Sequence, residues 1–171
     1  MPSPTIDPET IVLGTLMQAT PANARPILAR LHYRDFADPR GRYVFDLMAA
    51  FVTDNVPSLD PATLLGFADR IGAFRDTNHA HLLTRWVFNA YSVTVPLVAL
   101  DFHIARLIEH SYRRTVAANA ARLAQLAESS TLAELDAHCA HFTAQLTEHR
   151  ARITDPRPTG PSAIRPNRSA A

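Results

Sequence analysis

The second half of the chain has the most regular pattern of hydrophobic and polar positions. From Leu97 to Ala127, apolar residues recur mostly every three or four positions, which is typical of one face of an α-helix. A second row, with alternating steps of three and four, consists of Leu132, Leu135, Cys139, Phe142, Leu146, His149 and Ile153. This is the heptad spacing of helices that pack side by side. The pattern predicts two helices, over residues 97–127 and 132–153.

A short polar segment between these helices indicates a turn. Thr131 and Glu134 have the spacing of a capping box, which satisfies free N–H groups at the start of a helix. Pro96 suits the first turn of the preceding helix, where no N–H is required. We therefore expect a long antiparallel helical hairpin over residues 96–153.

Two helices alone leave much of an apolar row uncovered. The hairpin therefore either packs back onto its own chain or associates with a second copy, and we expect self-association. The residues expected to mediate it are Leu132, Leu135, Cys139, Phe142 and Leu146.

Four dipeptides in the first half place a helix-capping side chain directly before proline. They are Asp7-Pro8, Thr20-Pro21, Asp38-Pro39 and Asp60-Pro61. The first residue accepts hydrogen bonds from free N–H groups, and proline fits the first helical position. Apolar residues at helical spacing follow each pair. The same spacing appears once more from about residue 79. The predicted helices cover residues 8–18, 21–31, 39–53, 61–71 and 79–89.

No segment alternates long enough for a clear β-strand, so we expect an all-α fold. A small orthogonal helical bundle over residues 6–95 should precede the hairpin over residues 96–153, which serves oligomerisation. The start, residues 1–5, and the tail, residues 154–171, are rich in proline and polar residues. We expect both to be disordered, because they have little apolar surface to bury.

The composition argues against nucleotide hydrolysis. All 17 basic residues are arginine, so the lysine of a phosphate-binding P-loop is absent. The five glycines are scattered and do not form a loop that surrounds a phosphate. No nucleophile is paired with a base at a recognisable spacing, and we name neither a catalytic residue nor a cofactor. The expectation is a protein that is not an enzyme.

Charge and cysteine content restrict the partners and the compartment. The formal net charge of +1 is evenly spread, so strong direct binding to nucleic acid is not expected. Cys139 is the single cysteine, and its place in the apolar row predicts a small buried hydrophobic residue. We find neither a signal peptide nor an apolar run long enough to span a membrane. A cytoplasmic location is the expectation.

Three polar residues of the second hairpin helix, Glu134, His138 and His141, form a weak candidate for a metal site. Their spacing places them on one helix face, and a carboxylate with two imidazoles can bind zinc. The exposed polar face that this helix needs explains the same pattern.

Asp35 and Asp38 would suit acid–base chemistry only within a cleft, and capping or turn roles fit both better.

Four segments carry short motifs in a consistent order. Residues 9–17 are similar to E-x-x-V-L-G-x-L, and residues 35–45 to D-F-x-x-x-x-H-x-x-I-F. Residues 56–64 are similar to P-I-D-x-x-T-L with one additional residue, and residues 103–109 with Arg114 to Y-x-x-x-V-x-E…R-x-L. Together these motifs resemble the N-terminal domain of DnaB-type replicative DNA helicases, over about residues 6–153.

The resemblance implies a small helical bundle followed by a dimerising hairpin, which agrees with the apolar pattern. It also implies a non-catalytic, primosome-type module of DNA replication that docks on primase or helicase. Arg106, Glu109 and Arg113 are the docking candidates, because charged rims orient association. The chain departs from the family at Gly41, where the motif has histidine, and at His103, where it has tyrosine.

The helicases of this family continue through a linker into an ATPase domain, and we expect this chain to be a collar without that motor. The helicase-binding domain of DnaG-type primases is related in fold, so this interpretation stays open. Two alternatives come from other classes. One is a metal- or ligand-binding regulatory helical protein, and the other is an inhibitor that caps a helicase ring.

Overall fold

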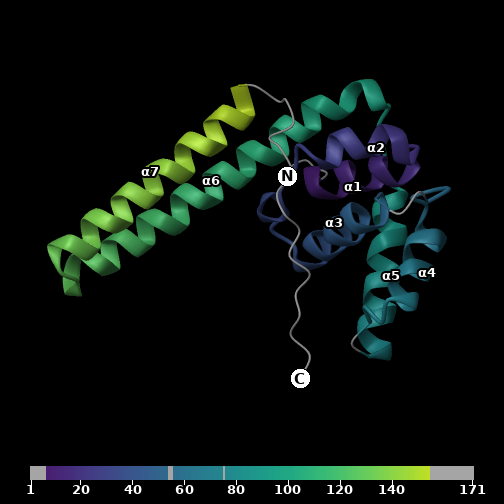
Figure 1. Cartoon of the computed structure of the whole chain (residues 1–171), viewed down its shortest axis with the longest axis horizontal. Coiled ribbons are helices and arrows are strands. Elements are labelled where there is room, and N and C mark those ends of the chain that lie inside the picture. Colours follow the sequence, from purple (N-terminus) through teal and green to yellow (C-terminus); the bar gives the residue numbers. More distant parts are fainter. Residues whose placement is uncertain (1–6, 54–55, 75, 155–171) are drawn as a thin grey trace, which may run out of the picture.

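The computed structural model describes residues 7–53, 56–74 and 76–154, and within these ranges it contains helices but no β-strand (Figure 1). The all-α fold predicted from the sequence is confirmed. The elements are α1 (Pro8–Gln18), α2 (Pro21–Leu28), the 3-10 helix η1 (Tyr33–Asp35), α3 (Pro39–Phe51), α4 (Pro61–Arg70), α5 (Thr77–Tyr91), α6 (Leu97–Ser129) and α7 (Leu132–Thr154).

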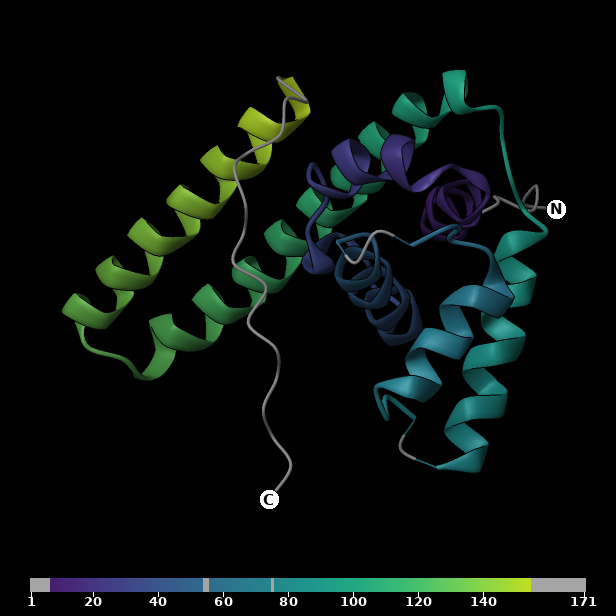
Figure 2. The same cartoon turned by 45° about the vertical axis from the view of Figure 1, so that its right-hand side comes forward.

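A helical bundle and a long hairpin make up the molecule (Figure 1). Helix α1 lies inside the bundle and packs against α3, α5 and α6. Helices α4 and α5 lie side by side, on the part of the bundle away from the hairpin tip (Figure 2). Helix α6 runs along the bundle and continues outward, and α7 returns beside it.

The starts of the first four α-helices agree with the predicted bounds because capping residues determine them. The side chains that accept hydrogen bonds from first-turn N–H groups are Asp7, Thr20, Asp38 and Asp60. The ends agree less well, since α2 ends at Leu28 and not at Leu31. Helix α5 begins at Thr77, before the predicted residue 79, because Asp76 accepts a hydrogen bond from the N–H of His79 at 2.7 Å.

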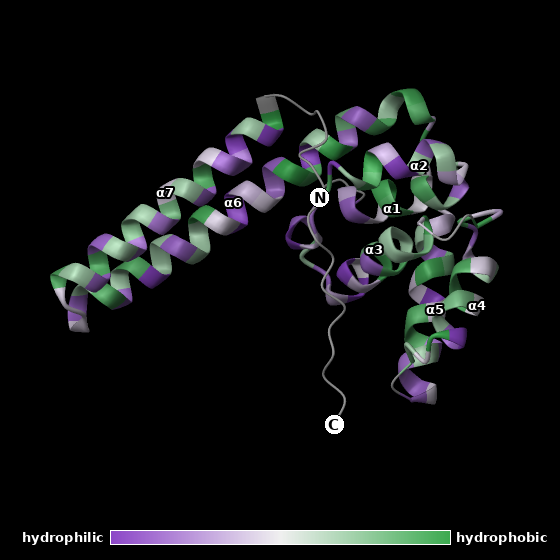
Figure 3. Ribbon diagram, in the orientation of Figure 1, coloured by the Kyte–Doolittle hydropathy of each residue, from purple (hydrophilic) through white to green (hydrophobic). Residues whose placement is uncertain are grey.

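The hydrophobic core lies between the bundle helices and the first half of α6. Leu100, Ile104 and Leu107 of α6 are buried in the same cluster as Leu13 and Leu16 of α1. In Figure 3 hydrophobic positions gather where these helices meet, whereas both kinds of position alternate along the two hairpin arms. The core therefore continues past residue 95, where the sequence places the end of the bundle, because the first half of α6, from Leu97 onward, packs against α1.

Gly14, the glycine of the first motif, permits a close contact between α1 and α5. A Cβ atom at this position would lie 2.0 Å from the carbonyl oxygen of Ala90 and 2.7 Å from that of Val93. Any side chain would therefore force the two segments apart. The neighbouring Thr15 hydroxyl accepts a hydrogen bond from the N–H of Val95 at 3.2 Å, which ties the extended joint between α5 and α6 to α1.

The predicted disorder at both ends falls outside what the structure describes. Residues 1–5 and residues 155–171 are not among the described residues, and Thr154 is the last residue of α7. Within the described ranges, no helix combines the length and the apolar character needed to cross a membrane.

Candidate interaction surface

The hairpin formed by α6 and α7 is the candidate surface for protein contacts. Its turn contains the predicted capping box: the N–H of Thr131 donates to Glu134 Oε2 at 2.9 Å, and the N–H of Glu134 donates to the Thr131 hydroxyl at 3.4 Å. Hydrogen bonds from the backbone and side chain of Thr131 lower the pKa of the Glu134 carboxyl. The box sets the start of α7, so that this helix runs back antiparallel to α6 (Figure 1).

Helix α7 is rotated relative to the predicted apolar row. Its half-buried or buried positions are 135, 138, 142, 145, 146, 149 and 152. Leu132, Cys139 and Ile153 are exposed, and Leu132 retains 74% of its accessible surface. A polar contact supports this orientation, because Asn119 Nδ2 of α6 donates to Gln145 Oε1 at 3.3 Å. The hairpin by itself therefore covers only part of the predicted row.

The expectation that Cys139 is buried is wrong for the single chain. Cys139 is exposed because the covered side of α7 runs through His138 and Phe142. The uncovered residues Leu132, Cys139 and Ile153, with the half-buried Leu146, recur at intervals of seven. They form a stripe along one side of α7, which we call the flank stripe.

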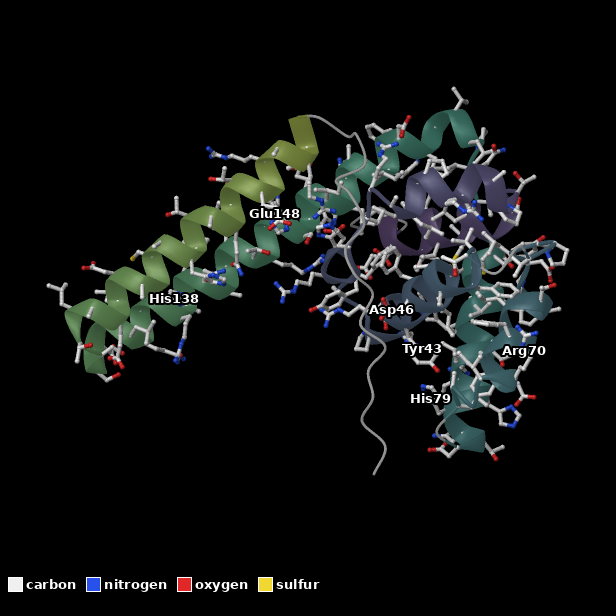
Figure 4. The ribbon with its side chains drawn as sticks, viewed as in Figure 1. Tyr43, Asp46, Arg70, His79, His138 and Glu148 are labelled. Carbon is white, nitrogen blue, oxygen red and sulfur yellow. The ribbon has the colours of Figure 1, made fainter. Side chains whose placement is uncertain are left out.

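Glu134, His138 and His141 are not assembled as a metal site. Glu134 is held in the capping box, and His141 Nε2 lies 2.9 Å from Gln145 Nε2. His138 is half-buried, on the side of α7 that borders α6 (Figure 4). Among the described residues, no group of three or more histidine, cysteine, aspartate or glutamate side chains is placed to hold a metal ion.

The docking candidates Arg106, Glu109 and Arg113 lie on the outer face of α6. Arg113 donates to Glu109 Oε1 from Nε at 3.1 Å and from Nη2 at 2.6 Å. These hydrogen bonds, with the nearby charges of Arg113 and Arg106, lower the pKa of the Glu109 carboxyl. Arg106 and Arg113 are both exposed, so this group is open to an approaching partner.

Two exposed apolar residues that the sequence analysis missed extend the same face. Val98 retains 90% of its accessible surface and Phe102 retains 64%. Both precede Arg106 at intervals of four, so one side of the helix carries all three. The apolar row that enters the core lies on the other side of α6. A helical wheel of α6 would have shown Phe102 on the opposite side. We call Val98, Phe102, Arg106, Glu109 and Arg113 together the docking face.

The motif residues Glu9 and Arg114 join α1, α6 and the segment after η1. The carboxylate of Glu9 accepts hydrogen bonds from the N–H groups of Ala37 at 2.6 Å and Asp38 at 3.1 Å. Arg114 lies 3.7 Å from Glu9 and donates to the carbonyl oxygen of Asp35. Burial raises the pKa of the Glu9 carboxyl, and the two N–H donors oppose that shift. These residues connect elements of the fold, and Arg114 faces inward while its neighbour in sequence faces solvent.

Asp35 is fully buried and pairs with Arg152 from the last turn of α7. Nη1 of the guanidinium donates to Oδ1 at 3.1 Å, and Nη2 donates to Oδ2. Oδ2 also accepts from the N–H of His32 at 2.8 Å, which supports the turn at η1. The turn role predicted for Asp35 agrees with this contact, whereas its pairing with Arg152 has no local signal in the sequence, because 117 positions separate the two residues.

Asp38, the other acidic residue considered for acid–base chemistry, caps α3. It accepts a hydrogen bond from the N–H of Arg40 at 2.9 Å and pairs with its guanidinium at 2.7 Å. The hydrogen bond from the Arg40 side chain lowers the pKa of the Asp38 carboxyl. Asp38 thus remains charged at neutral pH and orders the start of a helix.

Fold and surface define an all-α domain with a projecting helical hairpin. The family model described as "DnaB-like helicase N terminal domain" matches residues 1–96, which is more than half of the 171 residues. The chain belongs to this family, and the resemblance inferred from the four motifs is confirmed. It is therefore a module related to replicative DNA helicases, and in that family this domain is the non-catalytic part.

A solved structure supports the same fold. It is described as "Crystal structure of the N-terminal domain of DnaB helicase from Mycobacterium tuberculosis", with a TM-score of 0.64 and 21% sequence identity. The match covers 87% of this chain and 99% of that chain. The structural match covers more of this chain than residues 1–96 alone, so the likeness in fold extends into the hairpin. No curated protein matches the chain.

Proposed function

We propose that this chain is a non-catalytic interaction module of DNA replication, which self-associates through its hairpin and docks on a primase or a replicative helicase. One observation carries the proposal. Within a domain of this family, the flank stripe of α7 exposes apolar residues that the single chain does not cover. Apolar residues grouped on one exposed face are typical of protein–protein contacts.

Self-association is supported by the spacing of the flank stripe. Residues seven positions apart are what one helix presents to another in a packed pair. Leu132 and Ile153 are exposed at the two ends of α7, and Cys139 and Leu146 lie between them. Two copies related by a two-fold axis would cover each other's stripe, because such an interface uses the same patch twice. We therefore infer a dimer or a multiple of dimers.

An aspartate in the middle of the stripe tests this association. Cys139→Asp keeps the α6–α7 contact, because Cys139 is exposed in the single chain. A carboxylate buried between two copies is costly without a partner. Light scattering at high micromolar concentration should show a dimer or a larger multiple for the wild type, and a smaller particle with unchanged helical circular dichroism for the variant.

The matched control is His141→Asp, which places the same charge on the same helix outside the stripe. His141 is also exposed, so the control should assemble like the wild type. A wild-type chain that stays monomeric at high micromolar concentration would contradict self-association. Equal dissociation of both variants would place the interface elsewhere on α7.

Docking on a larger replication protein is supported by the docking face of α6. Val98 and Phe102 offer an apolar centre, and Arg106, Glu109 and Arg113 continue it as a charged rim. Buried apolar anchors supply most of the affinity of an interface, and rim charges steer and orient the encounter. Oligomerisation and helicase–primase interactions are known properties of this domain family, which supports a partner of that kind.

Binding to the purified primase and replicative helicase of the same organism tests the docking face. Phe102→Asp should weaken the binding at least tenfold, and Arg106→Glu by a smaller factor, mainly through slower association. Arg122→Glu is the control, because Arg122 is exposed on the outer part of α6. Deletion of residues 155–171 should leave binding unchanged. A wild-type chain that binds neither protein would contradict docking while leaving self-association intact.

A further inference from the structure

The last turn of α7 buries an arginine against the bundle, whereas its apolar residue Ile153 stays 41% exposed beside a cavity. Of residues 132–153 in α7, Arg152 alone is buried, with 5% of its surface accessible. Its guanidinium pairs through both terminal nitrogens with the fully buried Asp35. Nη2 also donates to the carbonyl oxygen of Arg30 at 3.2 Å. A helix of 23 residues thus places one charged side chain in the buried contact at this end.

Cavities border this arginine on two sides. One of about 160 Å³ is lined by Arg152 with Arg30 and Ile153, and one of about 220 Å³ by Arg152 with Arg34 and Glu148. Nε of Arg152 has no acceptor among the described residues, and neither has Nε of Arg30. A side chain bordered by cavities has fewer neighbouring atoms to attract it. The ion pair with Asp35 is therefore the most deeply buried contact at this end of α7.

The neighbouring contacts between the end of α7 and its surroundings are polar as well. His149 Nε2 lies 3.3 Å from the Ser111 hydroxyl, and Glu148 Oε1 lies 3.8 Å from His32 Nδ1. Figure 4 shows Glu148 on the side of α7 nearer to α6. Such groups exchange their partners for water when they separate, so each resists opening only modestly. Polar contacts between segments are typical of associations that open and close.

We propose that the Asp35–Arg152 pair is a latch on the free end of the hairpin. When the pair is closed, it holds the last turns of α7 against the bundle. When it opens, residues from about His149 onward leave the bundle, while α6 keeps its place through the apolar core. Both hydrogen bonds of the pair depend on one guanidinium position, so the two states are discrete. Opening exposes Asp35 and Ser111, and the base of the hairpin then presents a different surface.

Hydrogen exchange of the full chain, read by mass spectrometry, tests the latch. In Arg152→Met, amides of residues 149–154 should exchange at least tenfold faster than in the wild type, while those of residues 98–111 keep their rate. Arg152→Lys should give an intermediate rate, because lysine keeps the charge but cannot form the two-pronged pair. Arg122→Met, at an exposed position of α6, is the control and should match the wild type.

Three results would overturn the latch. The first is an unchanged rate over residues 149–154 in Arg152→Met, and the second is wild-type amides there that already exchange like an unprotected peptide. The third is a comparable rise over residues 98–111, which would mean that the whole fold had loosened. Should Arg152→Met fail to fold, Arg152→Lys provides the same readout. Loss of the fold in both variants also overturns the proposal, because a latch leaves the bundle intact.

Discussion

The two arms of the hairpin meet the bundle in opposite ways. Helix α6 buries Leu100, Ile104 and Leu107 in the core, whereas α7, over residues 132–153, buries Arg152 against Asp35. Burial of one large apolar side chain contributes roughly 1.5–3 kcal/mol and requires no matching charge. For a buried ion pair, the cost of removing both charges from water offsets much of their attraction. Apolar burial therefore stabilises the packing of α6 on the bundle. The packing of α7 on the bundle relies on a buried ion pair, whose net contribution is smaller.

The two arms also differ in how much of their apolar surface the chain itself covers. The first half of the apolar row of α6 meets α1 within one chain, and its members Leu100, Ile104 and Leu107 are almost fully buried. The flank stripe of α7 is only partly covered by its own chain: Leu146 is half-buried, and Leu132 at the start of the stripe is largely exposed. Equal periodicity thus leads to a core in one arm and to a candidate interface in the other.

The largest contrast is expected between leucines of the two arms. Leu107→Ala removes fully buried atoms and leaves a cavity, so the free energy of unfolding should fall by about 2–5 kcal/mol. Leu132→Ala, at an exposed position, should change it by no more than about 0.5 kcal/mol. Urea denaturation measures both in the Cys139→Asp background, where association does not contribute. Equal losses would break the comparison.

A smaller effect is expected from two glycines of the bundle. Gly14→Ala pushes a methyl group against the carbonyl oxygen of Ala90 and should destabilise the chain by roughly 1–3 kcal/mol. Gly66→Ala, in α4, meets nothing within 4 Å and should stabilise the chain by about 0.4–1 kcal/mol. Thermal unfolding separates the two directions. A stabilising Gly14→Ala would contradict the close contact of α1 with α5.

Removal of a helix cap should lower the free energy of unfolding by about 1 kcal/mol. Asp60→Ala removes a cap that accepts N–H bonds from Ala62 at 3.0 Å and Thr63 at 3.1 Å. Hydrogen bonds from Thr63 lower the pKa of Asp60 below 3.8. Its contribution is therefore present above pH 3.8 and is lost as the pH falls through the lowered value. Thr131→Ala in the hairpin turn should cost less stability, because the hydrogen bond that the Thr131 hydroxyl accepts from the N–H of Glu134 is longer, at 3.4 Å. Chemical denaturation across this pH range, with Asp60→Asn as the conservative control, checks both expectations.

The smallest effect is expected at the base of the hairpin, where the end of α7 meets the bundle. Burial and the nearby charge of Arg152 lower the pKa of His32 below 6.5, while Asp35 and Glu148 oppose the shift and His149 adds to it. The folded chain therefore prefers neutral His32. This contribution to stability is complete above pH 6.5 and is lost as the pH falls through the lowered value.

His32→Asn should remove that part of the pH dependence, as measured by unfolding free energies on both sides of pH 6.5. Parallel pH profiles of variant and wild type would show that protonation of His32 does not contribute. The expected difference is confined to the base of the hairpin, so the control Leu132→Ala should keep the wild-type profile.

Local chemistry made much of the fold predictable. Asp7, Thr20, Asp38 and Asp60 precede prolines, and each cap forms within one turn of the helix that it starts. The capping box at Thr131 likewise sets the turn of the hairpin. The candidate surface was only partly predictable. Arg106, Glu109 and Arg113 were named, but Phe102 was not, because its exposure depends on which side of α6 the bundle covers.

The sequence by itself determined the α-helices, most of their starts and the family, because periodicity, caps and motifs are contained within short segments. Only the tertiary structure decided how α7 is rotated, since that depends on how α7 packs along α6 and on contacts between distant residues such as Arg152 and Asp35, 117 positions apart. This rotation turned Cys139 outward, against the expectation from the apolar row. The physical reason is that a helix pattern specifies which residues share a face. The packing of distant elements then specifies which face is covered.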